Sequence, residues 1–261
     1  MPVLHDEGII LRKYSVRETS YIFVIFTKKH GKIRGTLKGV RKPYPQFAGN
    51  FEMMNRCGIS FYRRKKKALD LITGCEAIEP FLNIRKDILR LTYSNYFIEL
   101  IDKITVEYDV NEGLYTCLSE ALRELSGKTN PKHIARIFEL KILQSIGFRP
   151  RLEQCARCGE EKFSDIFFSA PIGGILCGHC ANQALVSLKI SRGAVNFMKK
   201  ILEIDISRAT RVNVTRESAI ETEKALSAFI DYYIDSSFNT KKFIDDLESD
   251  KNIILDFVST L

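Results

Sequence analysis

The chain has 261 residues, enough to bury a substantial core in two or three modules, and it holds no run long and apolar enough to span a bilayer. Its net charge of +8 is uneven: residues 1–80 carry 16 lysines and arginines against 7 aspartates and glutamates, and the rest is nearly neutral. A basic segment on a neutral body predicts a surface for a polyanion, most commonly nucleic acid. Residues 1–13 show no signal peptide, so we expect a cytosolic protein.

Residues 1–80 are predicted to form strands. Residues 21–27 are β-branched and aromatic, and residues 32–38 alternate basic with apolar or small side chains, which gives one buried and one positive face. Gly31 supplies the turn between these two segments. Three further strands are predicted at residues 8–11, 53–62 and 69–79. Five short strands predict a small closed barrel, and the OB-fold has this strand count and commonly binds single-stranded nucleic acid.

A basic run at residues 63–67 joins the last two predicted strands. Such a turn is often only solvated, but other cations of the same segment accompany it. The predicted nucleic-acid-binding residues are Lys28, Lys29, Lys32, Arg34, Lys38, Arg41, Lys42, Arg63, Arg64, Lys65, Lys66 and Lys67. Candidates for stacking on bases, each of which alone is more typical of a core, are Tyr14, Tyr44, Phe47 and Tyr62.

From Pro80 onward the spacing of apolar residues becomes helical. Residues 83–108 and 114–125 are predicted helices, and a third follows the cap at Asn130 and ends at Gly147. Ser191 and Thr215 are the predicted caps of two later helices. The apolar stripes of these helices are typical of a core. We therefore predict a nucleic-acid-binding barrel over residues 1–80 and a helical domain over residues 81–261.

Four cysteines form two pairs, Cys155-Ala-Arg-Cys158 and Cys177-Gly-His-Cys180, with eighteen residues between the pairs. This spacing is typical of a structural zinc site, in which two tight turns each present two thiolates to one tetrahedral ion. Disulfides are the rival interpretation, but nothing indicates an oxidising compartment. The sequence thus predicts a structural Zn²⁺ held by all four cysteines in a module at residues 151–186, with His179 exposed or outside the ligand set.

Signs of catalysis are few. Four cysteine ligands leave no open position for water or substrate, and the sequence has no Walker A loop, no G-x-G-x-x-G and no G-x-S-x-G motif. A metal-dependent enzyme would need a cluster of carboxylates or histidines that we do not find. The predicted fold class is α+β: an N-terminal OB-fold barrel followed by an α-helical domain with an embedded four-cysteine zinc module.

Several segments, in one order along the chain, carry a resemblance to a known family. The most specific is the run Cys155-x-x-Cys158-Gly159, Phe168-Ser169, Gly173-Gly174 and Cys177-x-x-Cys180. The others are Glu7-Gly8-Ile9-Ile10-Leu11, Phe26-Thr27-Lys28-Lys29-His30-Gly31-Lys32, Lys38-Gly39-Val40-Arg41-Lys42, and the helix from Arg136-Ile137-Phe138-Glu139-Leu140 to Ile146-Gly147-Phe148. Over essentially its whole length, the chain resembles the bacterial RecO family of recombination mediators.

The resemblance implies a non-enzymatic DNA-repair protein that binds single- and double-stranded DNA and anneals complementary strands. It also implies that the protein acts with RecR to load RecA onto strands coated by single-stranded-DNA-binding protein, in the cytoplasm and at the nucleoid. One departure concerns the residues after Lys42, where the family often has a further basic or serine residue. This chain instead has a stiff aromatic loop, Pro43-Tyr44-Pro45.

The family likeness further implies that the helical domain receives the acidic and apolar C-terminal tail of single-stranded-DNA-binding protein. Such a tail needs an apolar groove with a cation at its mouth. The helix of residues 130–146 offers both kinds of side chain, and the predicted partner-binding residues are Arg136, Phe138 and Lys141. In the alternative interpretation Phe138 belongs to the core and Arg136 merely faces solvent.

Without the family likeness, the residues alone also fit a zinc-ribbon RNA-binding or transcription-associated protein. A basic OB barrel and a four-cysteine module suit that class equally well. The sequence does not rank DNA above RNA, and it does not indicate an oligomeric state.

Overall fold

The structure is a computed structural model that describes residues 2–16, 20–38, 51–64, 69–234 and 238–249. The chain divides into two compact units, one formed by Met1–Gly127 with Phe238–Leu261 and the other by Lys128–Ser237. Each unit is described by itself below. The predicted domain boundary after residue 80 stays a prediction. Among the described residues, none of the helices combines the length and apolarity that crossing a bilayer requires.

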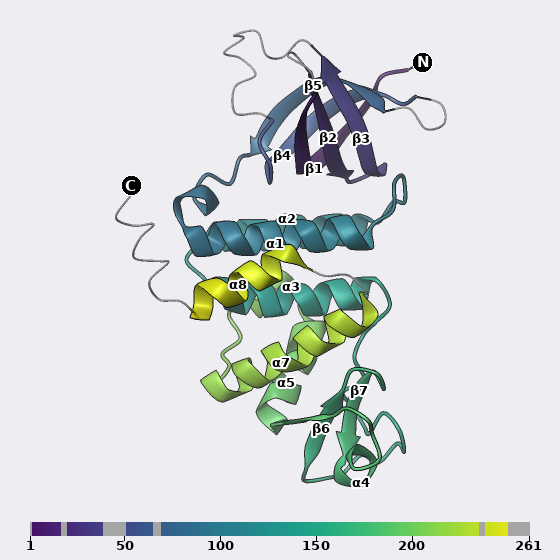
Figure 1. Cartoon of the computed structure of the whole chain (residues 1–261), viewed down its shortest axis with the longest axis vertical. Helices are drawn as coiled ribbons and strands as arrows, with labels where there is room; N and C mark the ends of the chain where they lie inside the picture. Colours follow the sequence, from purple (N-terminus) through teal and green to yellow (C-terminus); the bar gives the residue numbers. More distant parts are fainter. Residues whose placement is uncertain (1, 17–19, 39–50, 65–68, 235–237, 250–261) are drawn as a thin grey trace. The chain divides into compact units, whose positions relative to one another are not determined.

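The first unit begins with five strands that close into a barrel of order β1-β2-β3-β5-β4 (Figure 1). The predicted barrel is thus confirmed. Strands β3 and β5 pair in parallel, through Gly35–Asp70 and Thr36–Leu71, and the other neighbouring strands pair antiparallel. The strands are β1 Leu4–Val16, β2 Ser20–Thr27, β3 Gly31–Lys38, β4 Arg56–Tyr62 and β5 Asp70–Glu79.

The barrel core follows from the alternation of apolar residues along the strands. In β4, Cys57, Ile59 and Phe61 are buried while their neighbours are partly exposed. These side chains join Phe23 and Ile25 of β2 in one hydrophobic cluster. Because successive strand side chains point to opposite faces, the residues between them form the outer surface of the barrel.

Helices complete the first unit. They are the short 3-10 helix η2 Ile84–Lys86, α1 Ile88–Ile104, α2 Glu112–Leu125 and α8 Asn239–Ser249. The α1 and α2 helices contact each other, and α8 contacts α1. The predicted continuous helix at residues 83–108 is interrupted: Asp87 is extended and its side chain caps α1, so a separate turn precedes the helix.

The loop after α1 follows the edge of β3. Lys32 forms an isolated bridge with Glu107, and the Tyr108 N–H donates to the Lys32 carbonyl (2.9 Å). Gly31 lies at the closest approach, with φ +70, and a Cβ there would lie 2.2 Å from the Asp109 carbonyl oxygen. This contact requires a glycine because both the backbone angle and the space exclude a side chain.

The second unit combines packed helices with a small three-stranded sheet. Its helices are α3 Pro131–Ser145, α4 Gly178–Ala181, α5 Arg192–Glu203, α6 Ile206–Ala209 and α7 Arg216–Tyr233. Its strands, in the order β7-β6-β8, are β6 Ile166–Ser169, β7 Gly174–Cys177 and β8 Leu188–Ile190. Asn130, Ser191 and Thr215 cap α3, α5 and α7 through their side chains, as the sequence predicts.

Candidate metal centre and nucleic-acid interface

Two tight turns of the second unit present the four predicted cysteines. In the first turn the Gly159 N–H donates to the Cys155 carbonyl (2.9 Å), and Gly159 adopts φ +78, which favours glycine. In the second, β7 ends at Cys177, and this residue is the N-cap of α4, which carries Cys180. The short hairpin of β6 and β7 therefore fixes one pair, and the loop of residues 155–159 fixes the other.

The four Sγ atoms all lie within 4.8 Å of one another. Those of Cys158 and Cys177 are 3.8 Å apart, far beyond the roughly 2.05 Å of a disulfide. A tetrahedron of thiolates around one ion with metal–sulfur bonds of about 2.3 Å has edges of roughly 3.8 Å. The residues present therefore fit one tetrahedral thiophilic ion, and the predicted four-cysteine cluster is confirmed. Cys155, Cys177 and Cys180 are buried, and Cys158 is exposed.

The backbone around the cluster favours a thiolate at Cys155. Burial opposes its ionisation, but backbone N–H groups, including those of Cys158 and Cys177, hydrogen bond to the sulfur and lower the pKa of the thiol to about 6. The Cys177 N–H lies 3.4 Å from this Sγ. Burial instead raises the pKa of Cys180 to about 12. One sulfur is thus prepared as an anion, and a cation at the centre would stabilise the charge of all four.

A small apolar core surrounds the cluster. Leu176 and Ala181 are buried with the cysteines, and Phe163, Phe167 and Ile172 pack against them. His179 is exposed, and its Nε2 lies 3.2 Å from the Gln183 amide nitrogen. It is outside the group of four cysteines that could hold an ion.

The predicted nucleic-acid-binding residues of the barrel fall into different environments. Arg41, Lys42, Lys65, Lys66 and Lys67 lie outside the described residues, as do Tyr44 and Phe47, and Lys38 is described only in its backbone. The Lys28 and Lys29 N–H groups donate to the Glu7 carbonyl and the Asp6 carboxylate (both 2.9 Å), and Lys29 is exposed.

Lys32 is bound within the protein. It is 9% exposed, and its Nζ donates to the Asp102 carbonyl (2.5 Å) and carboxylate (3.0 Å). Arg12 binds the other oxygen of the same carboxylate at 2.6 Å. Because the Lys32 side chain is largely buried and its ammonium group is already bound to Asp102, it has little access to a phosphate. Its predicted DNA contact stays a prediction, and its evident role is to hold β3 to α1.

Arg34, Arg63 and Arg64 are exposed. Arg34 lies 3.6 Å from Glu107, a pair that is half open to solvent and therefore weak. The Arg63 guanidinium lies 4.1 Å above the ring centre of Tyr108. The Arg64 N–H donates to the Asp70 carboxylate (2.9 Å), and its side chain remains exposed.

Arg12 and the predicted stacking residue Tyr14 share the outer face of the barrel with Arg34. Arg12 and Tyr14 of β1 pair with Val24 and Ile22 of β2, which in turn pair with Arg34 and Thr36 of β3. These six residues form cross-strand rows on the outer face of the barrel. Tyr14 is 44% exposed, which suits a base-stacking role, whereas Tyr62 is partly buried. Arg12 was not predicted because it lies outside the most basic segments of the sequence.

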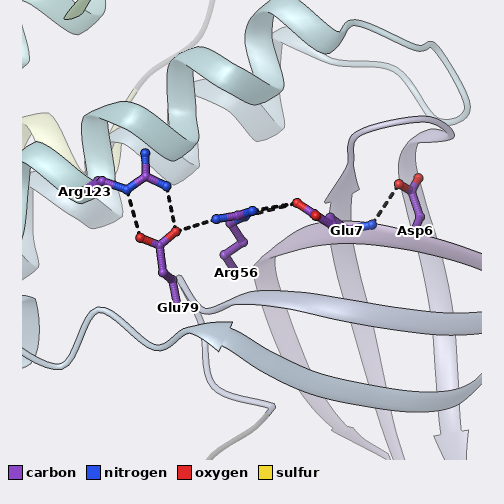
Figure 2. A network of polar contacts seen from close by, with 5 residues as sticks. All are labelled: Asp6, Glu7, Arg56, Glu79 and Arg123. Carbon is purple, nitrogen blue, oxygen red and sulfur yellow. Dashed lines mark hydrogen bonds and ion pairs between the residues drawn. The ribbon is translucent and has the colours of Figure 1, made fainter. Parts of the chain in front are cut away.

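A second group of ionic residues joins the barrel to α2. In Figure 2, Arg56 lies between Glu7 and Glu79, and Arg123 of α2 binds the far side of Glu79. The Arg123 hydrogen bonds lower the pKa of Glu79 despite partial burial. These carboxylates neutralise the cations around them, so this part of the barrel supports the fold and offers less charge to a ligand.

The three predicted partner-binding residues do not share one surface. Phe138 is fully buried, as in the alternative interpretation, and the Lys141 Nζ donates to the Leu202 carbonyl (3.3 Å). Arg136 binds Glu139 (2.8 Å) and Glu223 (2.9 Å), so it does not merely face solvent. Arg136 does line a cavity of about 480 Å³ with Asn130, Lys132, His133, Phe197, Val214, Arg216, Ala219, Ile220 and Glu223. The partner-binding role of the three residues stays a prediction.

The fold and the cluster together define a class of protein in which an OB-type barrel precedes a helical region holding a four-cysteine module. Comparison with known families agrees with this class. The family model described as "Recombination protein O N terminal" matches residues 1–81, and the one described as "Recombination protein O C terminal" matches residues 85–242. The chain belongs to the RecO family of DNA repair proteins, which are non-enzymatic recombination mediators.

Individual relatives support the same assignment. The DNA repair protein RecO of Symbiobacterium thermophilum is 32% identical over 254 residues, covering 95% of this chain and 99% of the relative. That of Moorella thermoacetica is 31% identical over 253 residues, covering 96% and 94%. That of Listeria monocytogenes strain HCC23 is 27% identical over 248 residues, covering 95% and 96%. Membership of this family implies DNA binding.

Proposed function

We propose that the protein binds single- and double-stranded DNA through the outer face of its barrel and anneals complementary strands. With RecR, it helps load RecA onto single strands coated by single-stranded-DNA-binding protein, at the nucleoid in the cytoplasm. The observation that carries the DNA-binding step is the exposure of four basic residues of the barrel, Lys29, Arg34, Arg63 and Arg64. Other basic residues of the barrel, such as Lys32 and Arg56, are instead bound by carboxylates. Family membership supports the recombination steps.

The chemistry of the exposed residues suits both forms of DNA. Arginine and lysine bind phosphates, which single and double strands share, and each phosphate contact releases condensed counterions. Tyr14 adds an exposed ring in the cross-strand row next to that of Arg34, and a base can stack on this ring only where the base is unpaired. Binding through phosphates without reading the sequence is what a protein that anneals arbitrary strands requires.

We further propose that the four-cysteine cluster holds a structural Zn²⁺. Four thiolates at this separation suit zinc, and a complete ligand set serves folding rather than catalysis. The ion would replace a larger core in a module whose strands are three or four residues long.

For the tail of single-stranded-DNA-binding protein, the cavity beside Arg136 is the proposed site. Phe197 and Ile220 provide apolar walls, and Lys132, Arg136 and Arg216 provide cations for a carboxylate. The predicted helix of residues 130–146 contributes Lys132 and Arg136, while the apolar contacts come from α5 and α7 in place of Phe138.

A binding titration tests the central proposal. Arg63→Ala with Arg64→Ala should weaken binding of labelled single-stranded DNA and lower the slope of log affinity against log salt by roughly 0.7 per lost phosphate contact. The matched control is Arg208→Ala with Arg211→Ala, two exposed arginines of the second unit. If the two double variants lost DNA affinity equally, or if neither lost any, the barrel interface would be contradicted. Unlabelled RNA of equal length should compete less well than DNA, and stronger competition by RNA would favour the RNA-binding class.

A further inference from the structure

Tyr108 has an unusual backbone conformation. Its φ of 64° lies in the left-handed region, which bulky side chains rarely adopt. Such a conformation is strained and persists where surrounding contacts impose it. Here the Tyr108 N–H is held by the Lys32 carbonyl (2.9 Å), so the loop after α1 is fixed to the edge of β3.

The strained backbone directs the Tyr108 side chain to the barrel. Its ring packs against the hydrophobic cluster of the barrel, and its hydroxyl donates to an oxygen of Asp70 (3.1 Å). Asp70 is fully buried at the start of β5, and its other oxygen accepts the Arg64 N–H (2.9 Å). One carboxylate thus joins Tyr108 to Arg64, the second residue of the basic loop between β4 and β5. Burial and the charge of Asp70 raise the pKa of Tyr108 to about 12, so the hydroxyl keeps its proton near neutral pH.

The same ring supports Arg63. The guanidinium lies 4.1 Å above the ring centre, and the side chain is exposed. Stacking of this kind fixes the plane of a guanidinium while leaving its N–H groups at the edge available to a phosphate. An exposed arginine normally loses considerable side-chain entropy when it binds, and a stacked one has already lost part of it.

We propose that Tyr108 is a positioning residue for DNA binding: it holds Arg63 in place for a backbone phosphate and fixes the start of the basic loop through Asp70. The proposal rests on the barrel interface proposed above. It makes a residue of the loop after α1, outside the strands, part of the nucleic-acid site, and it accounts for the strained backbone of Tyr108.

The test is a double-mutant cycle measured by binding of single-stranded DNA. Tyr108→Asn removes the ring but tolerates the left-handed backbone. It should weaken binding about two- to fivefold, the equivalent of an exposed cation–π contact. In an Arg63→Ala background the same substitution should cause a clearly smaller loss, because only the contact through Asp70 is then left to remove. Tyr232→Asn, which removes an exposed tyrosine of the second unit, is the matched control and should leave binding unchanged.

Arg63→Lys provides a second measurement that does not disturb the barrel core. It keeps the charge but loses the planar stack, so binding should weaken about twofold. Wild-type affinity in both Arg63→Lys and a folded Tyr108→Asn would overturn the proposal, as would a full Tyr108→Asn effect in the Arg63→Ala background. If Arg63→Ala weakens binding while Tyr108→Asn does not, only the positioning role fails. If Arg63→Ala and Arg64→Ala leave binding unchanged, the barrel interface fails as well.

Discussion

Arg123 of α2 binds both carboxylate oxygens of Glu79, at 2.9 and 2.8 Å, and so fastens the last barrel strand to a helix 44 residues further along the chain. Arg56 of β4 binds the same carboxylate at 2.6 Å and joins it to Glu7 of β1. Two-pronged arginine–carboxylate pairs are among the stronger ionic contacts in proteins. This network therefore links three strands of the barrel, β1, β4 and β5, to helix α2 of the same unit.

Glu79→Gln should lower the free energy of unfolding by about 1–2 kcal/mol at neutral pH, because it removes a charge-assisted partner from two arginines. Urea unfolding measures the change. Glu203→Gln is the control, because the Glu203 carboxylate is largely exposed and lies 3.8 Å from the Lys200 Nζ. This variant should have the free energy of unfolding of the wild type.

The same network should make stability depend on acid pH. The folded pKa of Glu79 is lowered, chiefly by Arg123, so its contribution is complete above the unfolded pKa of about 4.3 and is lost as pH falls through the lower folded value. In Glu79→Gln this part of the acid-side loss should disappear. If the free energy of unfolding fell with the same slope in wild type and Glu79→Gln between about pH 6 and pH 3, this assignment would be contradicted.

Loss of a cluster ligand should remove the metal. Cys155→Ser is expected to abolish bound zinc and to reduce solubility, since the module lacks a large core. Elemental analysis of the purified proteins measures the ion. Cys117→Ala, which changes a buried cysteine outside the cluster, should retain it. A structural zinc site would be refuted if the wild-type protein contained no zinc, or if folded Cys155→Ser bound as much zinc as the wild type.

Glu99→Ala should release α8 from α1. The Glu99 carboxylate accepts hydrogen bonds from the Asn239 N–H (3.2 Å) and from the Thr240 N–H (3.1 Å) and hydroxyl (2.5 Å), so it serves as the cap of α8. Loss of a cap costs about 0.5–2 kcal/mol. Hydrogen exchange should accelerate in α8 and remain slow in α7. Equal acceleration in both helices would indicate general destabilisation instead of a lost cap.

The tail-binding cavity is best tested away from Arg136. Arg136→Ala removes the guanidinium from Glu139, which is 2% exposed, and should destabilise the protein by about 3–5 kcal/mol. Arg216→Ala changes an exposed cavity residue and should leave stability unchanged. The same substitution should weaken the binding of a labelled peptide with the sequence of the tail about tenfold or more, which is the equivalent of a charged hydrogen bond. Fluorescence anisotropy measures this affinity. Unchanged peptide affinity would remove Arg216 from the site.

Local sequence patterns predicted the elements whose signals are local. Strand alternation indicated the barrel, and the caps at Asn130, Ser191 and Thr215 marked the starts of three helices. The two CxxC pairs indicated the cluster because thiolate ligands require such spacing. Helix α8 was not predicted, because it is short and its apolar residues Ile244 and Leu247 are buried by packing on distant α1.

Local sequence patterns do not reveal ion pairs between residues that are far apart in the sequence. Lys32 looks like a DNA contact in its strand, but its partner Asp102 is 70 positions away. Tyr108 falls within a predicted helix, yet lies in a loop whose role depends on β3 and β5. Phe138 could not be assigned to a groove or a core from helical spacing alone. In each case the deciding contact is set by tertiary structure.

The first unit is discontinuous in sequence, because the chain leaves it after Gly127 and returns at Phe238. Phe238 is 3% exposed and packs edge-on against Tyr96 of α1. Since a ribosome delivers the chain from its N-terminus, the whole second unit with its cysteines emerges before Phe238 does. That unit can fold during synthesis, with all four cysteines of the cluster already available. The packing of α1 in the first unit, by contrast, stays incomplete until translation has passed α8.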